Sequence, residues 1–136
     1  MQQKPTYEID GSRFSTLEGF YDEISRVIIP GAEWGRNLDA FNDILRGGLG
    51  TPEGGFVLRW NNSALSRARL SYTETARQLE LSLKRCHPAN REHAAQALND
   101  AKQGKGSTVF DWLVEIIGVH AAGGREAEDE VNLVLA

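Results

Sequence analysis

The chain has 136 residues, of which 40% are hydrophobic and 25% charged, a length and composition typical of one globular domain over residues 1–136. A net charge of −4 disfavours nucleic acid as a partner, because nucleic-acid affinity depends on neutralising phosphates with lysine and arginine, and suits a basic protein partner. The single cysteine, Cys86, excludes an internal disulfide and fits a reducing compartment. No apolar leader follows Met1 and no apolar run of about 18 residues occurs, so we expect a cytoplasmic protein without membrane contact.

The start of the chain predicts a short strand and an amphipathic helix. Residues 6–10 alternate weakly in polarity and end at Gly11, as a strand before a turn does. Ser15 and Glu18 have the spacing of a capping box, in which each side chain accepts a hydrogen bond from a backbone N–H group at the helix start. Pro30 should end this helix. Its apolar residues recur at helical spacing and predict one buried face, which consists of Leu17, Phe20, Tyr21, Ile24, Val27 and Ile28.

A second helix is predicted to begin at Asn37, whose side-chain oxygen can accept a backbone N–H group as an N-cap. Gly35 allows a tight turn before this helix, and either glycine of the pair 47–48 can end it in the left-handed conformation. Asp39 and Asp43 are four residues apart on the face opposite the apolar stripe, so the helix presents two carboxylates to solvent. The apolar stripe itself consists of Leu38, Phe41, Ile44 and Leu45.

The second half of the chain predicts two strands and four helices. An apolar run at 56–60, bounded by turn residues, is typical of a strand covered on both faces in a parallel sheet. A short helix, capped by residues 61–63, should then run to about Leu70. Three more helices are expected, ending at His87, at Gly104 and at the glycines 123–124. An acidic loop at 126–130 leads to a closing strand at 131–135, and helical connections between strands predict an α/β fold with a small parallel sheet.

Residues 34–43 have the sequence WGRNLDAFND. This stretch resembles the second-helix motif of the barstar family of intracellular ribonuclease inhibitors, an aromatic residue followed by Gly-x-Asn-Leu-Asp-Ala-hydrophobic-x-Asp. The resemblance implies three parallel strands packed with helices, and two aspartates that enter the basic active site of a ribonuclease in place of substrate phosphates. By this resemblance the contact carboxylates are Asp39 and Asp43. The rest of the implied partner-binding surface consists of Trp34, Gly35, Asn37, Asn42 and Arg46.

Several positions depart from the family pattern. Glu33 and Asn42 stand where barstar has aromatic residues, and Arg46 stands where it has a neutral polar residue. Arg46 can also pair with Asp43 three residues earlier, which would reduce the negative charge of the surface. The family's contact glutamate on the last helix has no aligned counterpart, because Gly118 falls near its place.

The helices expected between residues 73 and 106 have no counterpart in the short form of the family. Residues 77–81 (RQLEL) and 110–117 (FDWLVEII) are similar to a longer bacterial branch of barstar-related proteins. The resemblance implies a monomeric immunity protein of the toxin–antitoxin type that forms a one-to-one complex with a basic ribonuclease or related toxin. The alternative is a barstar-fold interaction or regulatory domain that binds a non-ribonuclease protein through the inserted helices.

The sequence offers no complete catalytic or metal-binding set. Cys86 shares an apolar stripe with Leu79 and Leu83, so we expect a buried, inert thiol. Residues 104–108 (GKGST) lack the glycine spacing and the preceding strand of a phosphate-binding loop. The histidines lie on different segments and lack metal-ligand spacing; they are His87, His93 and His120. We therefore expect no enzyme activity, metal or cofactor, and Trp34 is equally consistent with a contact residue or a core residue.

Overall fold

The computed structural model describes residues 4–47, 51, 54–121 and 130–136. Strands β1 (Thr6–Asp10), β2 (Phe56–Asn61) and β3 (Val131–Leu135) form one sheet. Strand β2 is central and pairs in parallel with both neighbours, so the prediction of a small parallel sheet is confirmed.

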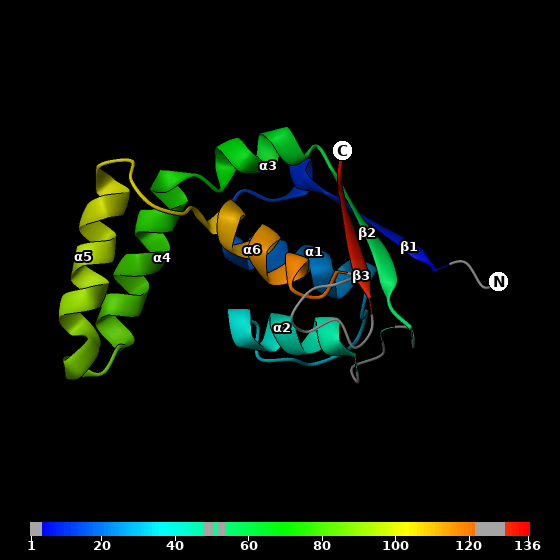
Figure 1. Cartoon of the computed structure of the whole chain (residues 1–136), viewed down its shortest axis with the longest axis horizontal. Coiled ribbons are helices and arrows are strands. Elements are labelled where there is room, and N and C mark those ends of the chain that lie inside the picture. The colour runs from blue at the N-terminus through cyan, green and yellow to red at the C-terminus, as the bar shows by residue number, and fades with distance from the viewer. Residues whose placement is uncertain (1–3, 48–50, 52–53, 122–129) are drawn as a thin grey trace.

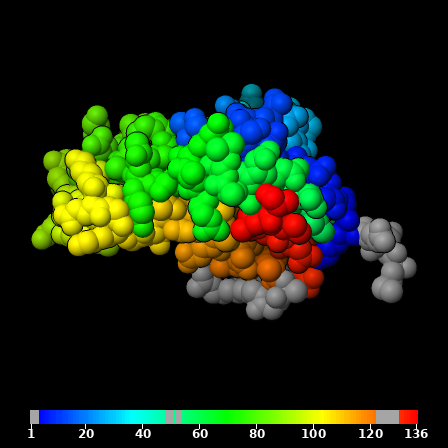
Figure 2. Space-filling view, turned by 90° about the horizontal axis from the view of Figure 1, so that it is seen from above, coloured from blue at the N-terminus to red at the C-terminus, as the bar shows by residue number. Residues whose placement is uncertain are grey.

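The helices lie on one side of this sheet. Helix α1 and helix α6 face it, α2 lies beside them, and α4 with α5 forms a hairpin at the end of the molecule far from the sheet (Figure 1). The space-filling view shows the same separation of the hairpin from β3 (Figure 2). The α-helices are α1 (Leu17–Val27), α2 (Leu38–Arg46), α3 (Ser63–Arg69), α4 (Tyr72–Arg85), α5 (Arg91–Lys102) and α6 (Val109–Gly118). Short 3-10 helices occupy Gly11–Arg13 and Pro88–Asn90.

Strand β2 is buried on one face only. Phe56, Leu58 and Trp60 are buried, whereas Arg59 between them is exposed. The prediction of a strand covered on both faces is therefore wrong, because the face that carries Glu8, Arg59 and Val134 is exposed. Arg59 lies in register with Glu8 of β1, and its Nε is 3.6 Å from a carboxylate oxygen of that residue.

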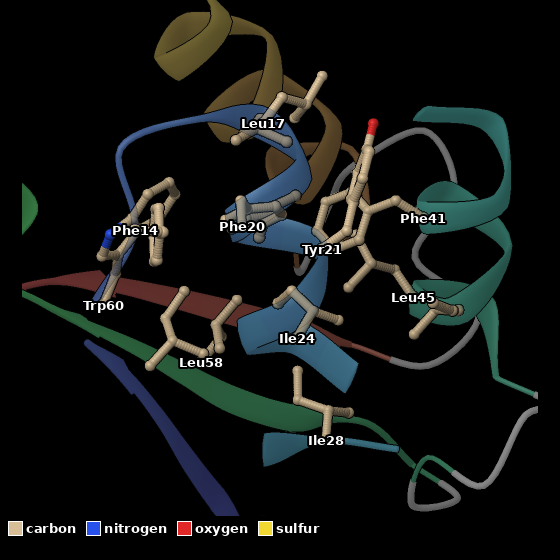
Figure 3. Packing of buried hydrophobic residues seen from close by; sticks show 14 of the residues in the cluster. Phe14, Leu17, Phe20, Tyr21, Ile24, Ile28, Phe41, Leu45, Leu58 and Trp60 are labelled. Atoms are coloured by element: carbon tan, nitrogen blue, oxygen red, sulfur yellow. The ribbon is translucent and has the colours of Figure 1, made fainter. Parts of the chain in front are cut away.

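Aromatic rings fill the space between the sheet and the helices. The ring of Phe20 lies 5.3 Å from Trp60 and 5.2 Å from Phe41, centroid to centroid, so α1 joins β2 to α2 (Figure 3). The buried indole N–H of Trp60 donates to Ser66 Oγ at 2.9 Å, which satisfies its one polar group. This cluster fixes α2 against the rest of the fold.

The first turns of α1 and α6 are completed by α4. Thr16 Oγ1 accepts the N–H of Gly19 at 3.0 Å, and the buried Glu74 carboxylate accepts the N–H of Leu17 at 2.8 Å. Thr75 Oγ1 likewise accepts the N–H of Val109, the first residue of α6, at 2.9 Å. The predicted capping box is wrong in its residues, because Thr16 is the N-cap and Glu18 instead forms an ion pair with Arg77 of α4.

The last helix is shorter than predicted. Helix α6 ends at Gly118, and the expected end at glycines 123–124 lies outside the described residues, as do residues 126–129 of the acidic loop. The chain leaves the helix through His120, whose carbonyl accepts the N–H of Val131 at 2.9 Å, and so leads to β3. Glu130 is described, and it pairs with Lys4 Nζ at 2.9 Å.

Candidate partner-binding surface

Helix α2 begins and ends as its sequence predicts. Asn37 Oδ1 accepts the N–H of Ala40 at 2.7 Å, and Gly47 ends the helix with φ of 99°. Phe41, Ile44 and Leu45 are buried, and in Figure 3 the labelled side chains of this face point toward α1. The apolar stripe therefore anchors the helix in one orientation.

The opposite face of α2 carries the two predicted carboxylates. Asp39 is exposed, and the Asp43 side chain is 64% exposed. Neither the sheet nor the α4–α5 hairpin covers them. Asp39 lies in the first turn, where a negative charge also stabilises the helix by about 0.3–1 kcal/mol through the helix dipole.

Arg46 does pair with Asp43, as its spacing suggested. The Nη1 of Arg46 is 3.6 Å from Asp43 Oδ1, and both side chains are about half exposed or more. An exposed pair of this kind contributes roughly 0–1 kcal/mol, so the carboxylate of Asp43 can exchange it for a better partner.

Asn42 lies between the two aspartates, and its side chain contacts a buried residue. Its Oδ1 is 2.6 Å from Nε2 of His120, a fully buried residue just beyond α6. Burial lowers the pKa of His120, and the nearby charge of Arg46 lowers it further, so the imidazole is neutral near pH 7. Because an amide oxygen can only accept, the tautomer that fits this contact carries its proton on Nε2 and donates it to Asn42 Oδ1. This bond joins the middle of α2 to the end of α6. Sequence reasoning treated His120 as a scattered histidine, and no local pattern marks its partner 78 residues away.

The turn before α2 is held against α1. Trp34 Nε1 donates to Ser25 Oγ at 2.7 Å, and its ring meets Tyr21 edge-on at 5.3 Å between centroids. The structure thus gives Trp34 a packing position on α1. The strained residue of the turn is Arg36, with φ of 48°, whereas Gly35 has little room for a side chain because a Cβ there would lie 3.1 Å from the Asn37 amide nitrogen.

A hollow of about 300 Å³ lies between α2 and α6, and a third carboxylate lines it. Glu115 of α6 is exposed and lines the hollow together with Asp39 and Asn42. Its apolar wall consists of Leu38, Trp112, Ile116 and Val119. Sequence reasoning missed Glu115 because it looked for a contact glutamate near Gly118, which lies three residues further along the helix.

A family model described as Barstar (barnase inhibitor) matches residues 4–116. The chain belongs to the barstar family. No curated protein matches the chain. The match covers the sheet strands β1 and β2, the acidic helix and most of α6, together with the α4–α5 hairpin.

Outside the α2 surface, the remaining expectations for this barstar-family chain concern its cysteine, metal ligands and membrane contact. Cys86 is only half buried, at the C-terminal end of α4, so the prediction of a buried thiol is wrong. Its Sγ lies 3.4 Å from the carbonyl oxygen of Leu83. Among the described residues no three His, Cys, Asp or Glu side chains form a group that could hold a metal ion. No helix in the described part of the chain is long and apolar enough to cross a membrane.

Proposed function

We propose that this barstar-family protein inhibits a basic ribonuclease or related toxin by placing Asp39 and Asp43 in its active site. The observation that carries the proposal is the exposure of both carboxylates, one turn apart, on a helix whose other face buries Phe41, Ile44 and Leu45. The complex would contain one copy of each protein, with the inhibitor a monomer that protects its own cytoplasm.

The rigidity of α2 supports this role. The helix is fixed by its N-cap, by its buried stripe and by the bond between Asn42 and His120. Carboxylates held in place lose little conformational freedom when they bind, so more of the interaction energy appears as affinity. Arginine and lysine side chains in a ribonuclease active site bind phosphate oxygens, and a carboxylate offers them similar charged acceptors.

The surroundings of the two aspartates fit a basic partner. Glu115 adds a third negative charge beside the hollow, and the apolar side chains Leu38 and Trp112 there give a partner some surface to bury. Opposite charges also accelerate encounter, with an association rate that falls as salt is added. In this proposal the start of α2 is shaped by Trp34, Gly35 and Asn37. The exposed ion pair between Arg46 and Asp43 breaks when Asp43 binds the partner.

The test is inhibition of purified bacterial guanyl-specific ribonucleases, barnase among them, by wild type and by the Asp39→Ala, Asp43→Ala double variant. Each carboxylate that makes charged hydrogen bonds contributes about 1.5–3 kcal/mol, so the double variant should bind on the order of a hundredfold to ten-thousandfold more weakly.

A matched control removes two negative charges elsewhere. Glu8 lies on the open face of the sheet and Glu92 on α5, and both are exposed. The Glu8→Ala, Glu92→Ala variant has the same net charge as the aspartate variant and should inhibit nearly as well as wild type. Equal inhibition by wild type and the aspartate variant would reject α2 as the contact surface.

A further inference from the structure

A groove of about 750 Å³ lies between α2 and α4, on the side of α2 that faces the hairpin. In Figure 1 the N-terminal end of α2 points toward the hairpin. Partly buried apolar side chains line the groove, among them Leu38, Leu81 and Trp112. The groove therefore adjoins the acidic surface, and one wall of it belongs to the inserted hairpin.

Most charges in the groove neutralise one another. Arg77 pairs with Glu18 and Glu74, and Arg36 pairs with Asp22. Two lining residues are different. Within the described part of the chain, the side chains of Asp39 on α2 and Arg85 on α4 have neither an ion pair nor a hydrogen bond. An occupant of the groove thus meets one unpaired negative charge from α2 and one unpaired positive charge from α4.

The hairpin is positively charged within an acidic protein. Residues 72–106 contain six lysines and arginines against four aspartates and glutamates, whereas the remaining residues contain nine against fifteen. Residues 72–106, the hairpin with the loop that follows it, have a net charge of +2, and the rest of the chain has −6. A partner that is basic everywhere would be attracted by α2 and repelled by Arg85.

We propose that the groove takes a segment of the same partner whose basic site receives Asp39 and Asp43, and that this segment carries a carboxylate to Arg85. The proposal rests on the proposed function and adds the determinant of partner choice. A ribonuclease with an acidic side chain beside its basic cleft gains an ion pair with Arg85. A ribonuclease without that acidic side chain would place a basic surface against Arg85, and the repulsion would weaken its binding.

The sign of one charge reversal separates this proposal from a general charge effect. If Arg85 makes no contact, Arg85→Glu makes the inhibitor more acidic, and a basic partner should bind equally well or more tightly. If Arg85 meets a carboxylate, the same change brings two like charges together and binding should weaken. Lys84 provides the matched control, because it is the neighbouring residue, is exposed and does not line the groove.

The experiment measures association and dissociation rates for the ribonuclease panel, barnase included, with wild type, Arg85→Glu, Arg85→Ala, Lys84→Glu and the double aspartate variant. For each ribonuclease that wild type inhibits, we expect Arg85→Glu to weaken binding by on the order of tenfold or more, mainly through faster dissociation. Arg85→Ala should have a smaller effect of the same sign, and Lys84→Glu should leave binding unchanged or tighter. Both Lys84 and Arg85 are exposed in the last turn of α4, so the two charge reversals should change the helix dipole interaction equally and give matching circular dichroism spectra and unfolding midpoints.

The outcomes distinguish the two proposals. If the double aspartate variant loses binding while Arg85→Glu behaves like Lys84→Glu, the groove proposal is wrong and the proposed function stands. If Arg85→Glu weakens binding but the aspartate variant does not, the groove binds the partner and the active-site role of α2 is wrong. If wild type binds no ribonuclease of the panel, inhibition of guanyl-specific ribonucleases is rejected, and the groove proposal is rejected with it.

Discussion

Glu74 joins the inserted hairpin to the domain core, and its replacement by alanine should destabilise the whole fold. Its buried carboxylate accepts hydrogen bonds from the Leu17 N–H at 2.8 Å, from Arg77 Nε at 2.6 Å and from Gln78 Nε2 at 3.1 Å. A buried N–H group left without an acceptor costs about 1–3 kcal/mol. Loss of the Arg77 contact adds up to about 1 kcal/mol, because that arginine is partly exposed and keeps its pair with Glu18. We therefore expect Glu74→Ala to lower the free energy of unfolding by about 1–4 kcal/mol.

The assay is chemical denaturation followed by circular dichroism, with Glu80→Ala as the control. Glu80 lies on the same helix but is 53% exposed, and its Lys102 pair at 3.6 Å should contribute less than about 1 kcal/mol. One transition is expected for each protein, because the hairpin and the core share these bonds. A loss below about 1 kcal/mol for Glu74→Ala, or a separate transition for the hairpin, would show that α4 does not support the core.

The same carboxylate predicts a pH dependence of stability. Burial favours the neutral acid, but hydrogen bonds from Arg77, Leu17 and Gln78 outweigh burial and hold the pKa of Glu74 below its usual value of 4.5. Folding therefore favours the ionised form, so its contribution is complete above that value and is lost as the pH falls below it. Between about pH 5 and pH 3, Glu74→Gln should lose less stability than wild type. Parallel curves for the two proteins would contradict the assignment.

Three further changes test the contact helix. Asn37→Ala removes the N-cap and should cost about 1 kcal/mol of unfolding free energy in denaturation experiments, whereas an unchanged midpoint would mean that the cap is dispensable. Asn42→Ala removes the acceptor 2.6 Å from buried His120 and should cost about 1–3 kcal/mol in the same assay; no loss would reject that bond as a support of α2. Arg46→Ala frees Asp43 from its exposed pair and should leave stability within about 0.5 kcal/mol while tightening binding to a basic ribonuclease; weaker binding would make Arg46 a contact residue.

Local features of the fold could be predicted from the sequence, and long-range ones could not. The start of α2 at Asn37 and the burial of Phe41, Ile44 and Leu45 depend on residues within one or two turns, and both predictions are confirmed. Leu38, the first residue of the predicted stripe, is only partly buried. The bonds from Glu74 to Leu17 and from His120 to Asn42 span 57 and 78 residues, and no spacing rule marks such partners. Ser15 and Thr16 could each cap the start of α1, and the sequence alone did not show which of the two hydroxyls accepts the helix N–H group.

The candidate site shows the same division. Exposure of Asp39 and Asp43 follows from helical periodicity, because the opposite stripe is apolar. The position of Glu115 beside Asp39 depends on how α6 packs against α2, which only the tertiary structure shows. The sequence of an apolar strand does not show whether helices cover one face of it or both, so the exposed face around Arg59 was not predicted.

The bonds that α4 makes to two other helices limit how the chain can be shortened. Deleting residues 73–106 to obtain a minimal inhibitor would remove Glu74 and Thr75 together, and with them the acceptors for the first N–H groups of α1 and α6. A truncated design would need replacement acceptors at both helix starts before its acidic surface could be compared with that of the parent. The inserted helices, which the short form of the family lacks, thus support the fold of this chain.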